Sequence, residues 1–156
     1  MKTVAHVGLL CVSLAILAPA LQAQDWTFTT KDDSITITQY TGSRANVTVP
    51  SLLNGLPVVT IGDKAFWNCT NLVSVTIPGT VKNIGDYAFG KCRNLKGLYF
   101  MSSAPRFGSS PFYKDYYLTI YYLPAASGWD QECCDRPTAQ WTLTDQRDAA
   151  GGVPSP

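Results

Sequence analysis

Ile61-Gly62-Asp63-Lys64-Ala65-Phe66 and Ile84-Gly85-Asp86-Tyr87-Ala88-Phe89 are close copies of each other, 23 residues apart. Cys69-Thr70-Asn71-Leu72 returns as Cys92-Arg93-Asn94-Leu95 at the same spacing. A fixed period of this length is typical of solenoids, because a single unit cannot bury its own apolar face and must stack on its neighbours. The sequence therefore predicts a stack of short repeats.

Weaker copies extend the repeat in both directions. The equivalent positions one further period along the chain are all apolar or small: Phe107, Gly108, Phe112, Leu118, Tyr121 and Leu123. In the other direction, Val47-Thr48-Val49-Pro50 matches Val75-Thr76-Ile77-Pro78 at a spacing of 28 residues, which implies an insertion around Asn54-Gly55-Leu56-Pro57. Asn-Gly before Pro favours a turn, so we expect a loop or a tight hairpin there.

Each position of the repeat predicts a local structure. Val75 and Ile77 alternate with polar residues, which indicates a short strand with these two side chains inward. Asp63, Asp86 and Ser109 precede Ala-Phe or Pro-Phe, and residues of these types cap helix N-termini. The phenylalanines that follow are expected to fill the core: Phe66, Phe89 and Phe112. The predicted fold is an α/β solenoid of about four rungs, with one parallel sheet on one face, short helical turns opposite, and capping segments at both ends.

The combination of a strand ending in Pro, the motif Ile-Gly-Asp-x-Ala-Phe-x-x-Cys-x-x-Leu and the 23-residue period resembles the BspA-like class of leucine-rich repeats. Residues 35–42 and 55–58 are similar to the usual opening of that class, and residues 120–129 and 136–141 to the terminal segment of many bacterial members. The resemblance covers residues 33 to 143. It implies the fold, but little about function, because these positions serve any scaffold of this type.

The ends of the chain predict export. Lys2 followed by an apolar run and small residues indicates a signal peptide over residues 1–23; the alternative is a retained membrane anchor. The expected leucine-rich repeat domain covers residues 24–143, and the protein is expected to be secreted or at a cell surface. Its parts are an N-terminal cap at 24–45 with a hairpin of Trp26–Phe28 and Ile35–Ile37, repeats at 46–124 and a C-terminal cap at 125–143, followed by a flexible tail at 144–156.

Composition excludes several functions. Without Lys2 the chain carries eleven basic and eleven acidic residues, so no net charge attracts nucleic acid. The only histidine, His6, lies in the leader, and nothing indicates a metal site or a cofactor. Two acidic groups, Asp32-Asp33 and Asp130 with Glu132 and Asp135, are expected to be solvated loop charges; the alternative is a carbohydrate-active enzyme. We therefore expect no enzymatic activity and no catalytic residues.

The cysteines leave alternatives open. Cys69 and Cys92 are equivalent in the repeat and should lie about 5 Å apart on adjacent rungs. They form either a disulfide or a ladder of buried thiols, and the family resemblance favours the ladder. Cys133-Cys134 is a possible disulfide between neighbouring residues, a bridge between two chains, or a pair of idle thiols.

The outward face of the predicted strands is the expected binding site. Solenoids present such faces to partners, and tyrosine suits both glycans and peptides. The alternative is that the tyrosines are ordinary strand formers, or that the chain is a structural spacer or a fragment of a larger exported protein. The expected partner is an extracellular protein or a glycan, and the oligomeric state stays open. The predicted outward row is Thr48, Thr76, Tyr99 and Tyr122, beside a row of Asn46, Ser74, Gly97 and Ile120.

Overall fold

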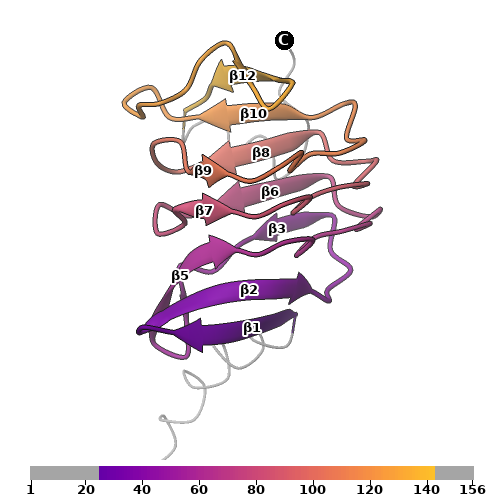
Figure 1. The fold of residues 1–156 in the computed structure, drawn as a ribbon. Helices are drawn as coiled ribbons and strands as arrows, with labels where there is room; N and C mark the ends of the chain where they lie inside the picture. The colour runs from indigo at the N-terminus through magenta and orange to yellow at the C-terminus, as the bar shows by residue number, and fades with distance from the viewer. Residues whose placement is uncertain (1–24, 143–156) are drawn as a thin grey trace, which may run out of the picture.

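Residues 25–142, which are the part of the chain described by the computed structural model, form a β-solenoid of about 4 turns (Figure 1). The back sheet contains, in spatial order, β1 (Trp26–Lys31), β2 (Ser34–Tyr40), β5 (Leu56–Ile61), β7 (Asn83–Ile84) and β9 (Arg106–Phe107), with β4 (Leu52–Leu53) beside β5. The front sheet contains β11 (Glu132–Cys133), β12 (Arg136–Gln140), β10 (Thr119–Tyr122), β8 (Gly97–Phe100), β6 (Ser74–Ile77) and β3 (Asn46–Thr48).

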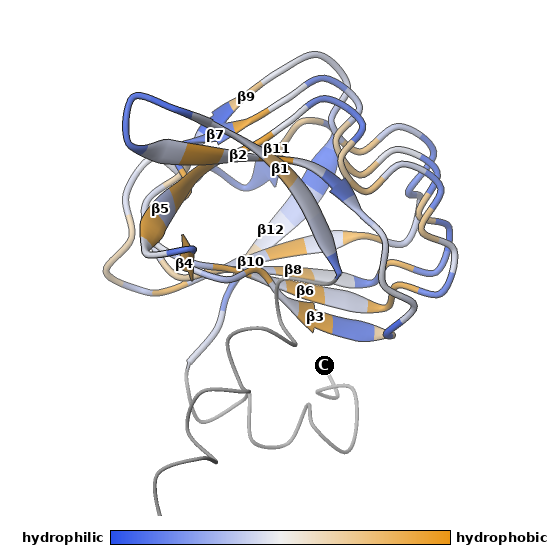
Figure 2. Cartoon of the chain, turned by 90° about the horizontal axis from the view of Figure 1, so that it is seen from below, coloured by the Kyte–Doolittle hydropathy of each residue, from blue (hydrophilic) through white to orange (hydrophobic). Residues whose placement is uncertain are grey.

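The chain passes from the back sheet to the front sheet once in each turn. Seen along the stack, the cross-section is triangular, and its third side is made of irregular segments (Figure 2). We call this third side the turn side; it comprises residues 62–73, 85–96 and 108–118. The predicted repeats are confirmed, because Val47, Val75, Leu98 and Ile120 pair in register across the front sheet.

Two features of the predicted fold are wrong: within residues 25–142 there is no helix, and there are two sheets instead of one. On the turn side, alternate amides donate to the next rung or to a carbonyl three residues earlier; Phe66 N donates to Ala88 O at 2.7 Å, for example, and Trp67 N to Lys64 O at 2.9 Å. Residues with positive φ, such as Lys64 and Asn68, recur between them. A helix needs consecutive right-handed residues, so pairing between rungs replaces it.

The residues expected to be helix caps stabilise the stack instead. The carboxylate of Asp63 accepts the backbone amide of Asp86 at 2.8 Å, and the carboxylate of Asp86 accepts that of Ser109 at 2.7 Å. A side chain at Gly85 would place its Cβ 2.3 Å from the Asp63 carboxylate. The Ile-Gly-Asp motif therefore joins one rung to the next, with glycine providing the space.

The core is a ladder of aromatic and aliphatic side chains. The rings of Phe66 and Phe89 stack with their centroids 4.7 Å apart, and Phe112 follows at 6.1 Å from Phe89. All three are almost fully buried, as predicted. Trp26 and Tyr40 continue the ladder at its N-terminal end.

Three hairpins interrupt the parallel arrangement. The turns Asp32-Asp33, Asn54-Gly55 and Cys134-Asp135 all have two residues with positive φ, as two-residue hairpin turns of type I′ require. The predicted hairpins at the insertion and in the N-terminal region are thereby confirmed. The β1–β2 hairpin extends only the back sheet, and β11–β12 extends only the front sheet.

The remaining domain predictions concern the ends. The predicted signal peptide and tail lie outside the described residues, and the exact domain boundaries stay predictions. Nowhere between residues 25 and 142 is there a helix long and apolar enough to cross a membrane.

Candidate functional site

The predicted binding row lies on the outward face of the front sheet. Asn46 and Ser74 share a hydrogen bond of 2.7 Å, and Thr48 pairs in register with Thr76. Thr48 is exposed, whereas Ser74 and Thr76 are half-buried. This half of the face is therefore polar, with hydroxyl and amide groups on neighbouring rungs.

The predicted position of Tyr122 in this row is wrong. Tyr121, not Tyr122, pairs with Tyr99, because the last rung is one residue shorter than the 23-residue period. Tyr122 pairs with Phe100, and its ring stacks on Trp129 with centroids 5.5 Å apart. Ile120, which was expected to face outward, is fully buried.

The aromatic half of the row is covered by the C-terminal segment. The rings of Tyr99 and Tyr121 stack at 4.8 Å, and Trp141 packs edge-on against Tyr99 at 5.2 Å. Trp141 is only 3% exposed. Burial and the neighbouring Tyr121 raise the pKa of Tyr99. Sequence patterns could not reveal this packing, because Trp141 follows the last repeat.

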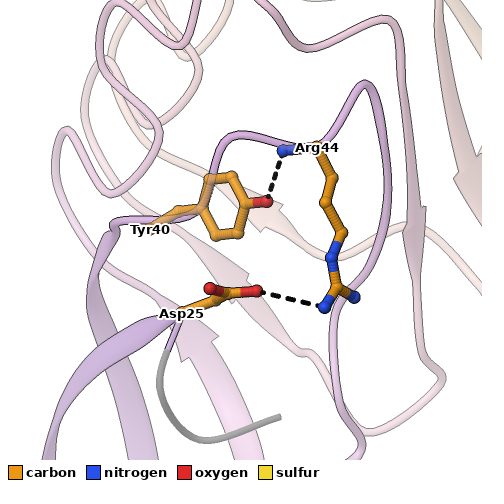
Figure 3. A network of polar contacts seen from close by, with 3 residues as sticks. All are labelled: Asp25, Tyr40 and Arg44. Atoms are coloured by element: carbon orange, nitrogen blue, oxygen red, sulfur yellow. Dashed lines mark hydrogen bonds and ion pairs between the residues drawn. The ribbon is translucent and has the colours of Figure 1, made fainter. Parts of the chain in front are cut away.

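A concavity of about 300 Å³ adjoins the polar half at the N-terminal end. Its walls include Thr48 and a polar group in which Arg44 forms an ion pair of 3.7 Å with Asp25 and donates its backbone amide to the Tyr40 hydroxyl at 3.3 Å (Figure 3). Burial is the main cause that raises the pKa of Tyr40. Sequence analysis missed Asp25 and Arg44, because they lie outside the repeat frame.

A second concavity, of about 560 Å³, lies beside the C-terminal ends of β3 and β6. Its lining residues include Thr48, Thr76, Leu52 and Met101, and Leu52 is 57% exposed. Thr48 lines both concavities. The polar half of the face is thus bordered by two hollows, each partly apolar.

The four cysteines within residues 25–142, Cys69, Cys92, Cys133 and Cys134, are free thiols in this structure. Cys92 is buried and its thiol donates to the carbonyl of Phe66 at 2.9 Å. Hydrogen bonding with Cys69 and burial raise the pKa of Cys92. The sulfurs of Cys133 and Cys134 are 3.5 Å apart, and a disulfide between them stays a prediction.

One buried carboxyl group was missed. Asp115 occupies the repeat position of Cys69 and Cys92, is completely buried, and has no hydrogen-bond partner for either oxygen. Burial raises its pKa to about 7, although the nearby Cys92 backbone amide and the positive charge of Arg136 act to lower the pKa. The signal was present in the repeat frame, where a carboxylate replaces a thiol.

The acidic groups named from the sequence lie apart. Asp32-Asp33 is the turn of the β1–β2 hairpin, and the group around Asp135 belongs to β11–β12 at the opposite end of the stack (Figure 1). Within residues 25–142, no three His, Cys, Asp or Glu side chains are grouped so as to hold a metal ion.

Comparison with known proteins is decisive for the family. The sequence model described as "BspA type Leucine rich repeat region (6 copies)" matches residues 30–128. The chain belongs to this family. The Ile-Gly-Asp motif and the aromatic ladder described above thus belong to a BspA-type leucine-rich repeat stack.

Solved bacterial leucine-rich repeat structures are similar to this chain. A leucine-rich cell surface protein of Faecalibacterium prausnitzii is 35% identical, with a TM-score of 0.55, over 62% of this chain and 28% of that one. A T. pallidum leucine-rich repeat protein is 24% identical, with a TM-score of 0.55, over 76% and 63%. One from Bacteroides capillosus is 24% identical, with a TM-score of 0.51, over 76% and 95%. No curated protein matches the chain.

Proposed function

We propose that this BspA-type chain is a secreted or surface-attached interaction module that binds an extracellular protein or a glycan through the front sheet and catalyses no reaction. The family supports an interaction role, and the description of the Faecalibacterium neighbour as a cell surface protein supports the location. The proposed contact residues are Thr48, Ser74 and Thr76, with Tyr99 at the border.

The observation that carries the proposal is the polar half of the front sheet, where Thr48 is exposed between two concavities. Thr48 lies at the centre, and hollows of about 300 and 560 Å³ flank it. A partner that fills both hollows with side chains or sugar rings would bury Leu52 and pair with the hydroxyls. Binding sites typically combine apolar surface with a small number of polar groups that fix the orientation of the ligand.

Binding of the purified mature protein to a panel of extracellular proteins and neutral glycans tests this proposal. The variant Thr48→Arg places a bulky charge between the hollows, and we expect it to weaken binding about tenfold or more. Thr30→Arg, an exposed threonine on β1 of the back sheet, is the matched control. Equal loss in both variants would contradict a site on the front sheet.

A structural spacer is the second candidate. The observation that favours it is the covered aromatic half of the face, which removes Tyr99 and Tyr121 as freely accessible anchors. Absence of binding across the whole panel by the folded protein would favour the spacer. A glycosidase needs two carboxylates about 5–10 Å apart across a cleft, and neither acidic group lines either of the two concavities beside the front sheet.

A further inference from the structure

The turn side carries a second cluster of aromatic residues, which the predicted site did not include. Trp67, Gly90 and Tyr113 occupy one repeat position on three successive rungs. A Cβ at Gly90 would lie 2.5 Å from the Trp67 ring, so the indole lies across the glycine of the next rung. Glycine at this position thereby brings the outer two aromatic residues together.

Three rings form this cluster. Those of Trp67 and Tyr113 are parallel within 2°, with their centroids 6.4 Å apart. The Tyr87 ring stands perpendicular to both, at 6.1 and 5.8 Å. Tyr113 is 41% exposed, and the exposed Tyr116 and Tyr117 follow it in the same segment.

Three lysines surround the rings. The ammonium groups of Lys91 and Lys64 lie 4.7 and 5.8 Å from the Trp67 ring, and that of Lys114 lies 5.2 Å from the Tyr113 ring. Asp63 and Asp86, which precede Lys64 and Tyr87 in the sequence, each use one carboxylate oxygen for a backbone amide of the next rung. Asp135 and Arg136 of the β11–β12 hairpin line a hollow with Tyr113 and Lys114, so one acidic and one basic residue are added at that end of the cluster. The lysines thus place positive charge directly beside aromatic faces.

We propose that this turn-side cluster, defined as Lys64, Trp67, Tyr87, Lys91, Tyr113 and Lys114, binds an anionic polysaccharide whose sugar rings carry carboxylate groups. A pyranose ring presents a flat face of C–H bonds that packs on the electron-rich face of an aromatic ring. A carboxylate attached to that ring pairs with the ammonium groups that lie over the Trp67 and Tyr113 rings. This second site lies on a different side of the stack from the front-sheet site and does not depend on it.

Other ligands fit the cluster less well. Ligands with an ammonium group are disfavoured, because the cluster already holds its own cations against its rings. An acidic peptide offers charge without a rigid apolar face. Extended peptides also gain affinity from a free strand edge, and the turn-side segments already pair with one another through their backbones.

The test uses polygalacturonate, its fully methyl-esterified form and poly-glutamate as probes for the mature protein. The ester keeps the sugar rings without the charge, and the polypeptide keeps the charge without the rings. We expect polygalacturonate to bind best and to weaken as salt rises. Lys91→Gln/Lys114→Gln and Tyr113→Ala should each weaken binding about tenfold. These variants change partly exposed side chains, and circular dichroism verifies their fold.

Matched controls are Lys82→Gln, which removes a lysine bonded to Gly79 O near the far corner of the stack, and Tyr117→Ala, which removes an aromatic outside the cluster. Both should bind polygalacturonate like the unchanged protein. Equal binding of poly-glutamate, equal loss in the controls, or no binding by the folded protein would each overturn the proposal. Thr48→Arg should leave polygalacturonate binding unchanged, so the two proposed sites can fail independently.

Discussion

The front sheet and the turn side are two outward surfaces of the same stack, but their aromatic residues have opposite fates. On the front sheet, Trp141 covers Tyr99 and the stacked Tyr121 lies beside it. On the turn side, Tyr113, Tyr116 and Tyr117 remain exposed. The caps explain the difference: both are hairpins that extend a sheet, so neither β1–β2 nor β11–β12 adds a strand to the turn side. The turn of β11–β12 borders the turn side, where Cys134 and Asp135 line a hollow with Tyr113, but it leaves the tyrosine rings of that side exposed.

A substitution in the core beneath both surfaces should lower the free energy of unfolding most. Phe89 lies between Phe66 and Phe112 and is fully buried. We expect Phe89→Ala to lower the free energy of unfolding by about 3–5 kcal/mol, because it leaves a cavity in the ladder. Urea unfolding measures the change. Tyr117→Ala, at an exposed position, is the control and should change stability by less than about 0.5 kcal/mol; similar losses in both would contradict the ladder.

Asp115, beneath the C-terminal end of the turn side, should make stability depend on pH. Its pKa is raised from 3.8 to about 7, chiefly by burial. Between these values the folded chain binds a proton that the unfolded chain has lost, so the free energy of unfolding falls as pH rises from 4 to 7. We expect a loss of up to about 4 kcal/mol.

Asp115→Asn should remove this part of the pH dependence and stabilise the protein at pH 8. Urea unfolding of both proteins at pH 4.5, 6 and 8 gives the comparison. Arg136 and Cys92, the other groups that influence the pKa of Asp115, are the same in both proteins, so they contribute equally to both pH curves. Parallel pH curves for the two proteins would show that the carboxyl group ionises normally.

Trp141→Ala would test why the two surfaces differ. Removal of the indole should expose Tyr99, lower its pKa toward 10 and decrease the free energy of unfolding by about 3 kcal/mol, the lower end for a buried aromatic residue. Ultraviolet titration of tyrosine measures the pKa, with Tyr99→Phe/Trp141→Ala to identify the group. An unchanged tyrosine titration would mean that the C-terminal segment does not cover the front sheet.

Lys91→Gln should have the smallest effect on stability. The ammonium group interacts with the Trp67 ring at the surface, and we expect a loss of less than about 1 kcal/mol in the free energy of unfolding. Thermal and urea unfolding measure it, with Lys82→Gln as control. A loss of several kcal/mol would assign the turn-side lysines to stability rather than to binding.

The sequence predicted the parts of the fold that depend on periodicity. The frame placed Phe66, Phe89 and Phe112 in the core, and the inserted Asn54-Gly55 marked a hairpin that the structure contains. Helical turns were wrongly expected, because Asp63 is a good cap in any context and the pattern does not show that amides pair with the next rung.

Repetition of apolar positions determined, from the sequence alone, that this chain stacks its units, because burial of a shared core requires the same side chains at the same spacing. The resemblance of those positions to BspA-type repeats implied the family. Only the tertiary structure decided which surface residues are accessible. A single missing residue in the last rung moved Tyr121 into the outward row in place of Tyr122, and the segment after the repeats placed Trp141 on Tyr99. Neither of these two features depends on the 23-residue period. The register of the last repeat strand depends on the number of residues in its own rung, and the covering of Tyr99 depends on a contact with Trp141, which is distant in the sequence.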